Sequence, residues 1–98
     1  MVFYEVTLDV EPGLAAELEA YMRGRHIPQI FATGCFRTIR LDRAGEARFR
    51  TRYGAHTQAD LDRYVAEHAP ALREDFAAHF PAGLALSREV WSEAERWG

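Results

Sequence analysis

The sequence contains no lysine, and all twelve of its basic residues are arginine. Fifteen acidic residues bring the formal net charge to −3, so the composition gives no electrostatic reason to expect nucleic acid or an anionic membrane as a partner. No apolar run approaches the roughly 20 residues that a membrane-spanning helix requires. We therefore expect neither nucleic acid nor a membrane among the partners of this chain.

Cysteine occurs only once, at Cys35, which excludes an internal disulfide and suits a reducing compartment. The N-terminal residues alternate like a strand and include an early acid, whereas a signal peptide begins with a basic and then an apolar segment. These features predict a cytoplasmic protein. A chain of 98 residues is long enough for one domain, spanning residues 1–98, and gains stability from a partner.

No complete catalytic, metal-binding or cofactor-binding motif occurs in the sequence. The four histidines are not spaced as in HxxxH or HxH, and a single cysteine cannot form CxxC. Glycine-rich phosphate loops and serine nucleophile elbows are also missing. We expect no metal site and no bound cofactor, and the residues alone do not identify a reaction.

The residues that are present predict four strands. The predicted strands span residues 2–10, 35–43, 46–53 and 84–91. The first alternates between apolar and polar side chains, which is the pattern of a strand with one buried face. A tight turn at residues 44–45 joins the middle two strands. The tail to Gly98 is expected to be either a short helix or frayed.

Two helical regions separate the strands. Pro12 opens the first, because a proline in a first turn loses no hydrogen bond. Gly24 weakens this helix, and Pro28 is expected to restart a short helical turn. Thr57, followed three residues later by an acid, resembles a capping box at the start of the second region. Pro70 removes one backbone hydrogen bond, so a kink or two consecutive helices should result.

The element order is therefore β-α-β-β-α-β, the ferredoxin-like arrangement of an α+β domain. Right-handed crossovers give a four-stranded antiparallel sheet with strand order 4-1-3-2 and both helices on one face. The other face then needs a cover, and a second copy of the chain is the simplest one. We expect a homodimer in which two sheets face each other as a dimeric α/β barrel.

The third strand places Arg48, Arg50 and Arg52 on the sheet face opposite the helices. One interpretation is a solvated or dimer-facing surface, in which acids such as Glu5 and Asp42 pair with these arginines. The other is a site between the sheet faces for a small anionic molecule, because guanidinium groups bind carboxylate and phosphate well.

His26 lies directly after the first helix. It is a candidate general acid or base at the rim of a cavity, with Tyr4 or Tyr53 as a supporting hydroxyl. The alternative is a structural role, in which the imidazole caps the last carbonyls of that helix. Cys35, near which the sequence places no base, is expected to be a small buried hydrophobic residue.

Several segments resemble a family of small bacterial proteins that is known only as a domain of unknown function. They are residues 4–7, the string HIPxxxATGxF over residues 26–36, residues 60–64 and 69–73, and more loosely residues 84–90. The resemblance implies a ferredoxin-like domain that pairs as a dimeric α/β barrel, and it implies no activity. The His-x-Pro at residue 26 is also similar to a motif in small dimeric α/β-barrel enzymes, including ring-degradation proteins and cofactor-free monooxygenases.

Three hypotheses about function stay open on this basis. The leading one is an uncharacterised dimer that binds a small anionic molecule between its sheet faces. Its candidate ligand-binding residues are Arg48, Arg50, Arg52, Tyr4 and Tyr53. The second is a cofactor-free enzyme, monooxygenase-like or isomerase-like, that uses His26 and requires an arginine to converge with it on one pocket. The third is a structural or interaction module without a ligand.

Overall fold

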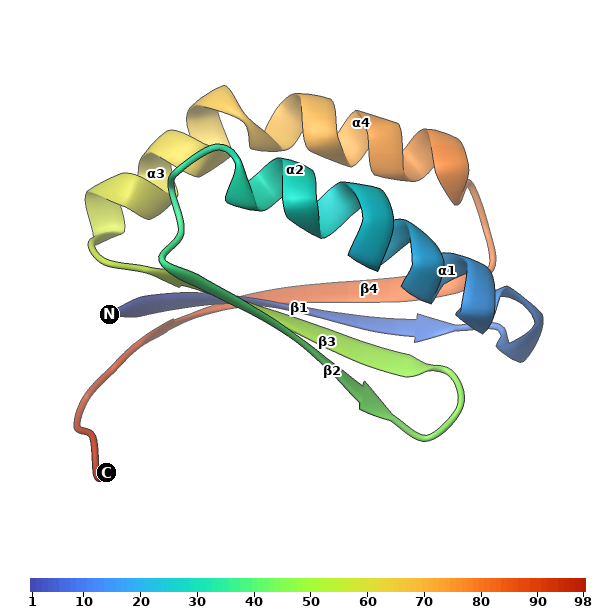
Figure 1. The fold of residues 1–98 in the computed structure, drawn as a ribbon, viewed down its shortest axis with the longest axis horizontal. Coiled ribbons are helices and arrows are strands. Elements are labelled where there is room, and N and C mark those ends of the chain that lie inside the picture. The colour runs from blue at the N-terminus through green and yellow to red at the C-terminus, as the bar shows by residue number, and fades with distance from the viewer.

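The computed structural model describes every residue, Met1–Gly98, and stacks the helices on one face of a single sheet (Figure 1). The strands are β1 (Val2–Val10), β2 (Thr38–Ala44), β3 (Arg48–Ala55) and β4 (Leu84–Ser92). The helical elements are η1 (Pro12–Leu14), α1 (Ala15–Tyr21), η2 (Met22–His26), α2 (Ile27–Phe31), α3 (Gln58–Glu67) and α4 (Ala69–His79).

All strand pairings are antiparallel, and the strand order is β2-β3-β1-β4. The chain crosses from β1 through α1 and α2 to one edge of the sheet, and later through α3 and α4 to the opposite edge (Figure 1). This confirms the predicted ferredoxin-like α+β fold and its strand order. Because both crossovers cover the same face, the other face of the sheet carries no second layer.

The strand boundaries differ from the predicted ones mainly at the second strand. It begins at Thr38 rather than at residue 35, because Cys35 and Phe36 are buried in the core before the chain joins the sheet. The third strand begins two residues later than predicted, at residue 48. The tail after Ser92 forms no helix, and Trp97 within it is 82% exposed.

A single π-helical turn, η2, connects α1 to α2 without interrupting the helix. In this turn the N–H of Ile27 donates to the carbonyl of Met22, five positions earlier. Pro28 has no N–H, and in a regular helix its ring would collide with the carbonyl of Gly24. The wider turn accommodates the proline. The helix therefore widens, and does not break, where the sequence predicted a weakening and a restart. The turn ends at His26.

The second helical region consists of two consecutive helices, as the proline within it predicted. The hydroxyl oxygen of Thr57 accepts a hydrogen bond from the N–H of Asp60 at 3.2 Å, which confirms the predicted cap of α3. α3 ends at Glu67, and Pro70 lies in the first turn of α4, where its missing N–H costs no bond.

The buried side chains form two clusters between the helices and the sheet. One cluster includes Tyr4, Tyr53 and Tyr64, and the other includes Leu8 and Met22. A cavity is lined by members of both clusters. The fold therefore places a cavity, open to solvent on one side, where the two halves of the core meet.

Candidate functional site

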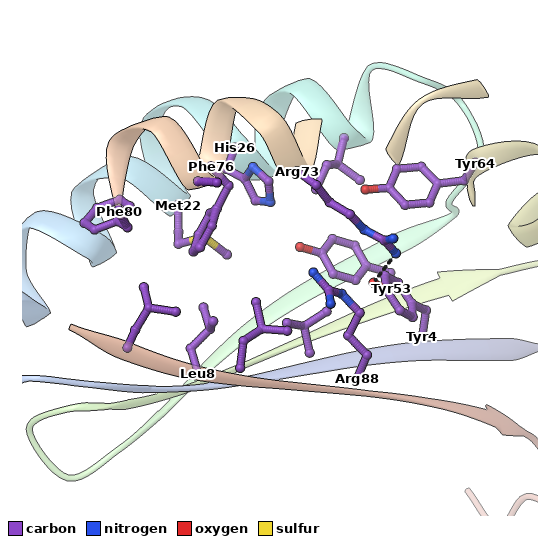
Figure 2. A pocket seen from close by; sticks show the side chains of 15 residues that line it. Tyr4, Leu8, Met22, His26, Tyr53, Tyr64, Arg73, Phe76, Phe80 and Arg88 are labelled. Carbon is purple, nitrogen blue, oxygen red and sulfur yellow. Dashed lines mark hydrogen bonds between the residues drawn. The ribbon is translucent and has the colours of Figure 1, made fainter. Parts of the chain in front are cut away.

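The cavity has a volume of about 460 Å³ and lies between the helices and the sheet (Figure 2). This volume falls within the range of small-molecule sites in proteins. Fifteen residues line the cavity, and none of them is acidic. Its polar lining residues are His26, Arg73, Arg88, Tyr4, Tyr53 and Tyr64, and the others are apolar.

His26 lies on the wall that the helices form, at the end of η2 (Figure 2). Its ring centroid is 5.3 Å from that of Phe76 and 5.6 Å from that of Tyr21. Its Nδ1 is buried without a hydrogen-bond partner, and the imidazole does not cap a helix. Burial lowers the pKa of His26 to about 4, against the opposing effect of the Asp75 carboxylate. At neutral pH the imidazole is therefore uncharged.

Three side chains beside His26 connect the first helical region to α4. The carboxylate of Asp75 accepts a hydrogen bond from the Tyr21 hydroxyl at 2.6 Å, and Arg25 donates to both of its oxygens at 2.9 Å. The bonds from Arg25 and Tyr21 hold the pKa of Asp75 well below its usual range. Burial, together with the bond to Asp75, raises the pKa of the Tyr21 hydroxyl. These contacts fix the turn that carries His26.

Two guanidinium groups and three tyrosine side chains gather at one end of the cavity (Figure 2). Nη2 of Arg73 donates to the hydroxyl of Tyr4 at 3.2 Å, and the rings of Tyr4 and Tyr53 stack with centroids 5.6 Å apart. Burial raises the pKa of Tyr64 to about 12, against the opposing positive charges of Arg73 and Arg88. The Tyr64 side chain is consequently a neutral hydroxyl at physiological pH.

The sequence analysis did not predict Arg73 and Arg88 as site residues, although the position of each in the sequence contains a recognisable signal. Arg88 is the cross-strand partner of Val6 and so faces the helices, in phase with Leu84 on the same strand. Arg73 shares one face of α4 with Phe76 by helical spacing. In both cases the signal is an arginine within an otherwise apolar stripe.

The arginines of β3 lie on the uncovered face, as predicted, and each is paired with an acid. The pairs are Arg48–Asp9 at 3.4 Å, Arg50–Asp42 at 2.9 Å and Arg52–Glu5 at 3.3 Å. Tyr4 and Tyr53 face the opposite side of the sheet, because neighbouring residues of a strand alternate between faces. The structure thus brings Tyr4 and Tyr53 together with His26 and separates them from these arginines. This corrects the prediction of one shared ligand site.

Metal-ligating side chains are dispersed over the molecule. No three histidine, cysteine, aspartate or glutamate side chains come together in a group that could hold a metal ion. Cys35 is buried in the core and 2% exposed, as predicted. None of the helices combines the length and the apolar character that crossing a membrane demands.

The family model of a domain of unknown function, DUF4286, matches residues 1–93. A comparison with curated proteins gives no match. Solved structures resemble the chain over nearly its whole length. SnoaB, a cofactor-independent oxygenase from Streptomyces nogalater, has a TM-score of 0.79 at 15% identity, with 97% of this chain and 94% of that chain covered.

Two further structures show the same likeness. A protein of unknown function from Nitrosomonas europaea has a TM-score of 0.67 at 16% identity, covering 99% of this chain and 94% of that chain. A dimeric ferredoxin-like protein from an uncultured marine organism has a TM-score of 0.63 at 7% identity, covering 99% and 98%. At such identities the likeness establishes the fold and assigns no activity.

Proposed function

The chain belongs to the DUF4286 family, whose function is unknown, and we propose that it binds a small organic molecule in the cavity between its helices and its sheet. The observation that carries the proposal is the cavity itself, which has a volume of about 460 Å³ and a mostly apolar lining. The cavity opens to solvent where Arg73 and Arg88 are exposed, so a small molecule can enter it from water. Few polar groups directed into an apolar space are typical of a ligand site.

The proposed site keeps three residues that the sequence predicted, His26, Tyr4 and Tyr53. His26 supplies an uncharged imidazole with no hydrogen-bond partner in the protein. Tyr4 contributes a hydroxyl that Arg73 already orients through a 3.2 Å bond. Tyr53 is 2% exposed, and its aromatic ring forms part of the wall. A bound molecule would thus meet mostly apolar contacts and a few fixed polar ones.

We assign the uncovered face of the sheet to a second copy of the chain, giving a homodimer. Arginines and acids alternate on this face, so two copies related by a twofold axis can bring opposite charges together. Phe3 and Trp91 are cross-strand partners on the same face, and Trp91 is 48% exposed. The dimeric ferredoxin-like neighbour supports this assembly as an analogy of fold.

A second candidate function is catalysis without a cofactor, with His26 as the general base. A neutral imidazole can take the proton of a weakly acidic C–H or O–H group, which breaks that bond and leaves the electron pair on the substrate. The guanidinium groups of Arg73 and Arg88 would then stabilise the resulting enolate or phenolate. The observation that carries this candidate is the position of His26 in the cavity wall, where its Nδ1 has no hydrogen-bond partner in the protein. The cofactor-independent oxygenase among the neighbours is consistent with it.

Ligand-observed NMR with a library of small aromatic and aliphatic fragments tests the binding proposal. Leu86→Trp fills the cavity from β4, and Arg50→Gln alters the uncovered face as a matched control. We expect fragments to bind the wild type and Arg50→Gln, and to lose binding in Leu86→Trp, with circular dichroism verifying that both variants fold. Fragments that still bind Leu86→Trp but not Arg50→Gln would contradict the proposed site.

Deuterium exchange at the acidic C–H of benzoylacetone, followed by NMR, tests the catalytic candidate. The wild type should accelerate the exchange, because His26 can remove that proton and return a deuteron. His26→Gln keeps a polar side chain of similar size without the base, so it should bind the compound and lose the acceleration. Equal exchange rates with the wild type and with His26→Gln would rule out His26 as the base.

A further inference from the structure

The two arginines of the cavity are among the few arginines of the chain that have no acidic partner. The chain has twelve arginines, and eight of them pair with an aspartate or a glutamate. The four without such a partner are Arg37, Arg73, Arg88 and Arg96, of which Arg73 and Arg88 line the cavity. Acids are not scarce, since fifteen of them outnumber the arginines.

The two guanidinium groups reach the same end of the cavity from different walls. Arg73 comes from α4 and Arg88 from β4, and Figure 2 shows both near Tyr4 and Tyr53. The only polar partner of Arg73 is the hydroxyl of Tyr4, and Arg88 has none. Because the cavity lining contains no acid, the positive charge at this end is not neutralised by the wall.

Two like charges at one site repel each other, and an anion between them is attracted to both. The side chains of Arg73 and Arg88 are exposed, so water screens the repulsion in the free protein and an anionic group can reach them. A purely structural role does not require this arrangement, because an arginine that only covers apolar surface is not harmed by a nearby acid. The absence of any acid therefore points to an anionic group from outside the chain.

The opposite end of the cavity is apolar. Phe76 of α4 and Phe80, which directly follows this helix, face Leu8 of β1 across the space (Figure 2). His26 lies between this end and the arginines (Figure 2). Buried aromatic and aliphatic walls favour an apolar group, since its transfer from water is favourable. The cavity thus has one positive end and one apolar end.

We infer that the ligand is an amphipathic organic acid, whose carboxylate lies between Arg73 and Arg88 and whose apolar body extends toward Phe80. This inference rests on the proposed function and names the class of molecule that the site takes. Guanidinium groups bind a carboxylate through paired N–H donors, and a shell of hydroxyls adds further donors. In this orientation His26 lies beside the body of the ligand rather than its charged group, so any proton it takes comes from the body.

Isothermal titration calorimetry with two matched pairs of compounds tests the inference. The probes are 1-naphthylacetate against 1-naphthylacetamide and octanoate against octanamide, which differ in charge and little in size. We expect each acid to bind the wild type at least about tenfold more tightly than its amide, which corresponds to the loss of one charge-assisted contact. The affinity of the acids should also fall as salt is added.

The variant Arg73→Gln/Arg88→Gln removes both charges at sites that are exposed, so folding should be retained. It should weaken the binding of the acids to the level of the amides and leave the binding of the amides unchanged. Arg37→Gln changes another arginine without an acidic partner, one that does not line the cavity, and should alter neither affinity. If the amides bind as tightly as the acids, or the double variant binds the acids normally, the inference is wrong. If Leu86→Trp loses the binding of both acids and amides, the cavity is still supported as the binding site. Failure of this inference is therefore distinguishable from failure of the proposed function. Failure of both acids to bind the wild type would also overturn the inference.

Discussion

Tyr21 and Asp75 lie 54 positions apart and share a 2.6 Å hydrogen bond between hydroxyl and carboxylate. Arg25 donates twice to the same carboxylate, so α4 is held against the turn that ends at His26. Hydrogen bonds to an ionised acceptor are among the stronger ones in proteins. The position of the imidazole in the cavity wall thus depends on a contact between two helices from different halves of the chain.

Tyr21→Phe should lower the melting temperature by about 4–8 °C, because it leaves Asp75 with one donor fewer at a partly buried site. Tyr64→Phe is the matched control, since the Tyr64 hydroxyl is also in the core but has no hydrogen-bond partner in the protein. Circular dichroism melts of the two variants measure the difference. An equal shift in both variants would show that the bond to Asp75 contributes nothing specific.

Acid should destabilise the protein over the range in which His26 resists protonation. The pKa of His26 is about 4 in the folded chain and about 6.5 in the unfolded chain. Because the unfolded state binds the proton more readily, the free energy of unfolding is largest above about pH 6.5. As the pH decreases from 6.5 to 4, the free energy of unfolding falls by at most about 1.4 kcal/mol per pH unit.

Urea unfolding of the wild type and of His26→Gln at a series of pH values checks this dependence. The variant should lose much of the decline between pH 6.5 and pH 4, since it has no imidazole to protonate. The carboxylate of Asp75, whose pKa is lowered, loses its stabilising effect only below its ordinary value of 3.8 and so acts in a separate window. Identical slopes in the two proteins would contradict the assignment of His26 as a buried neutral base.

Gly54→Ala should destabilise the sheet by about 1–3 kcal/mol, through overpacking rather than backbone strain. A methyl group at this position would lie 2.5 Å from the hydroxyl oxygen of Thr38 and 3.2 Å from the ring of Phe3. Gly13→Ala, where nothing lies within 4 Å, is the control. Combining Gly54→Ala with Thr38→Ala should recover part of the loss in urea unfolding. No recovery would mean that the clash with Thr38 is not the cause.

Arg50→Glu should dissociate the proposed homodimer in sedimentation velocity experiments. The substitution places a second negative charge beside Asp42, with which Arg50 now pairs at 2.9 Å, and so removes the alternation of charge on the uncovered face. Arg63→Glu changes another exposed ion pair, on α3, and should leave the dimer intact. A stable dimer with Arg50→Glu would exclude this face as the interface.

Local patterns in the sequence were sufficient to predict most of the fold. Alternation along β1, the cap at Thr57 and the proline at residue 70 each act over a few neighbouring residues, and the element order then determines the topology. The predicted start of β2 was wrong, because Cys35 and Phe36 are held in the core by contacts with distant residues. Such tertiary burial leaves no local signal.

The site was less accessible to sequence reasoning, because a cavity depends on how far the helices lie from the sheet. Tyr4, Tyr53 and His26 were predicted as site residues, but the partners that gather with them are Arg73 and Arg88. Those two lie in stripes where apolar residues dominate, and only the assembled fold brings α4 opposite β4. The arginines of β3 are more conspicuous in the sequence, yet each is paired with an acid on the other face of the sheet.

The two methionines allow the central claim to be tested in one measurement, because they report on opposite faces of the sheet. Met22 lines the cavity, and Met1 lies on the uncovered face beside Phe3. In protein labelled with ¹³C at the methionine methyl groups, a bound fragment or 1-naphthylacetate should shift the Met22 signal and leave that of Met1 in place. A ligand that shifts Met1 alone would locate binding on the uncovered face and contradict the account.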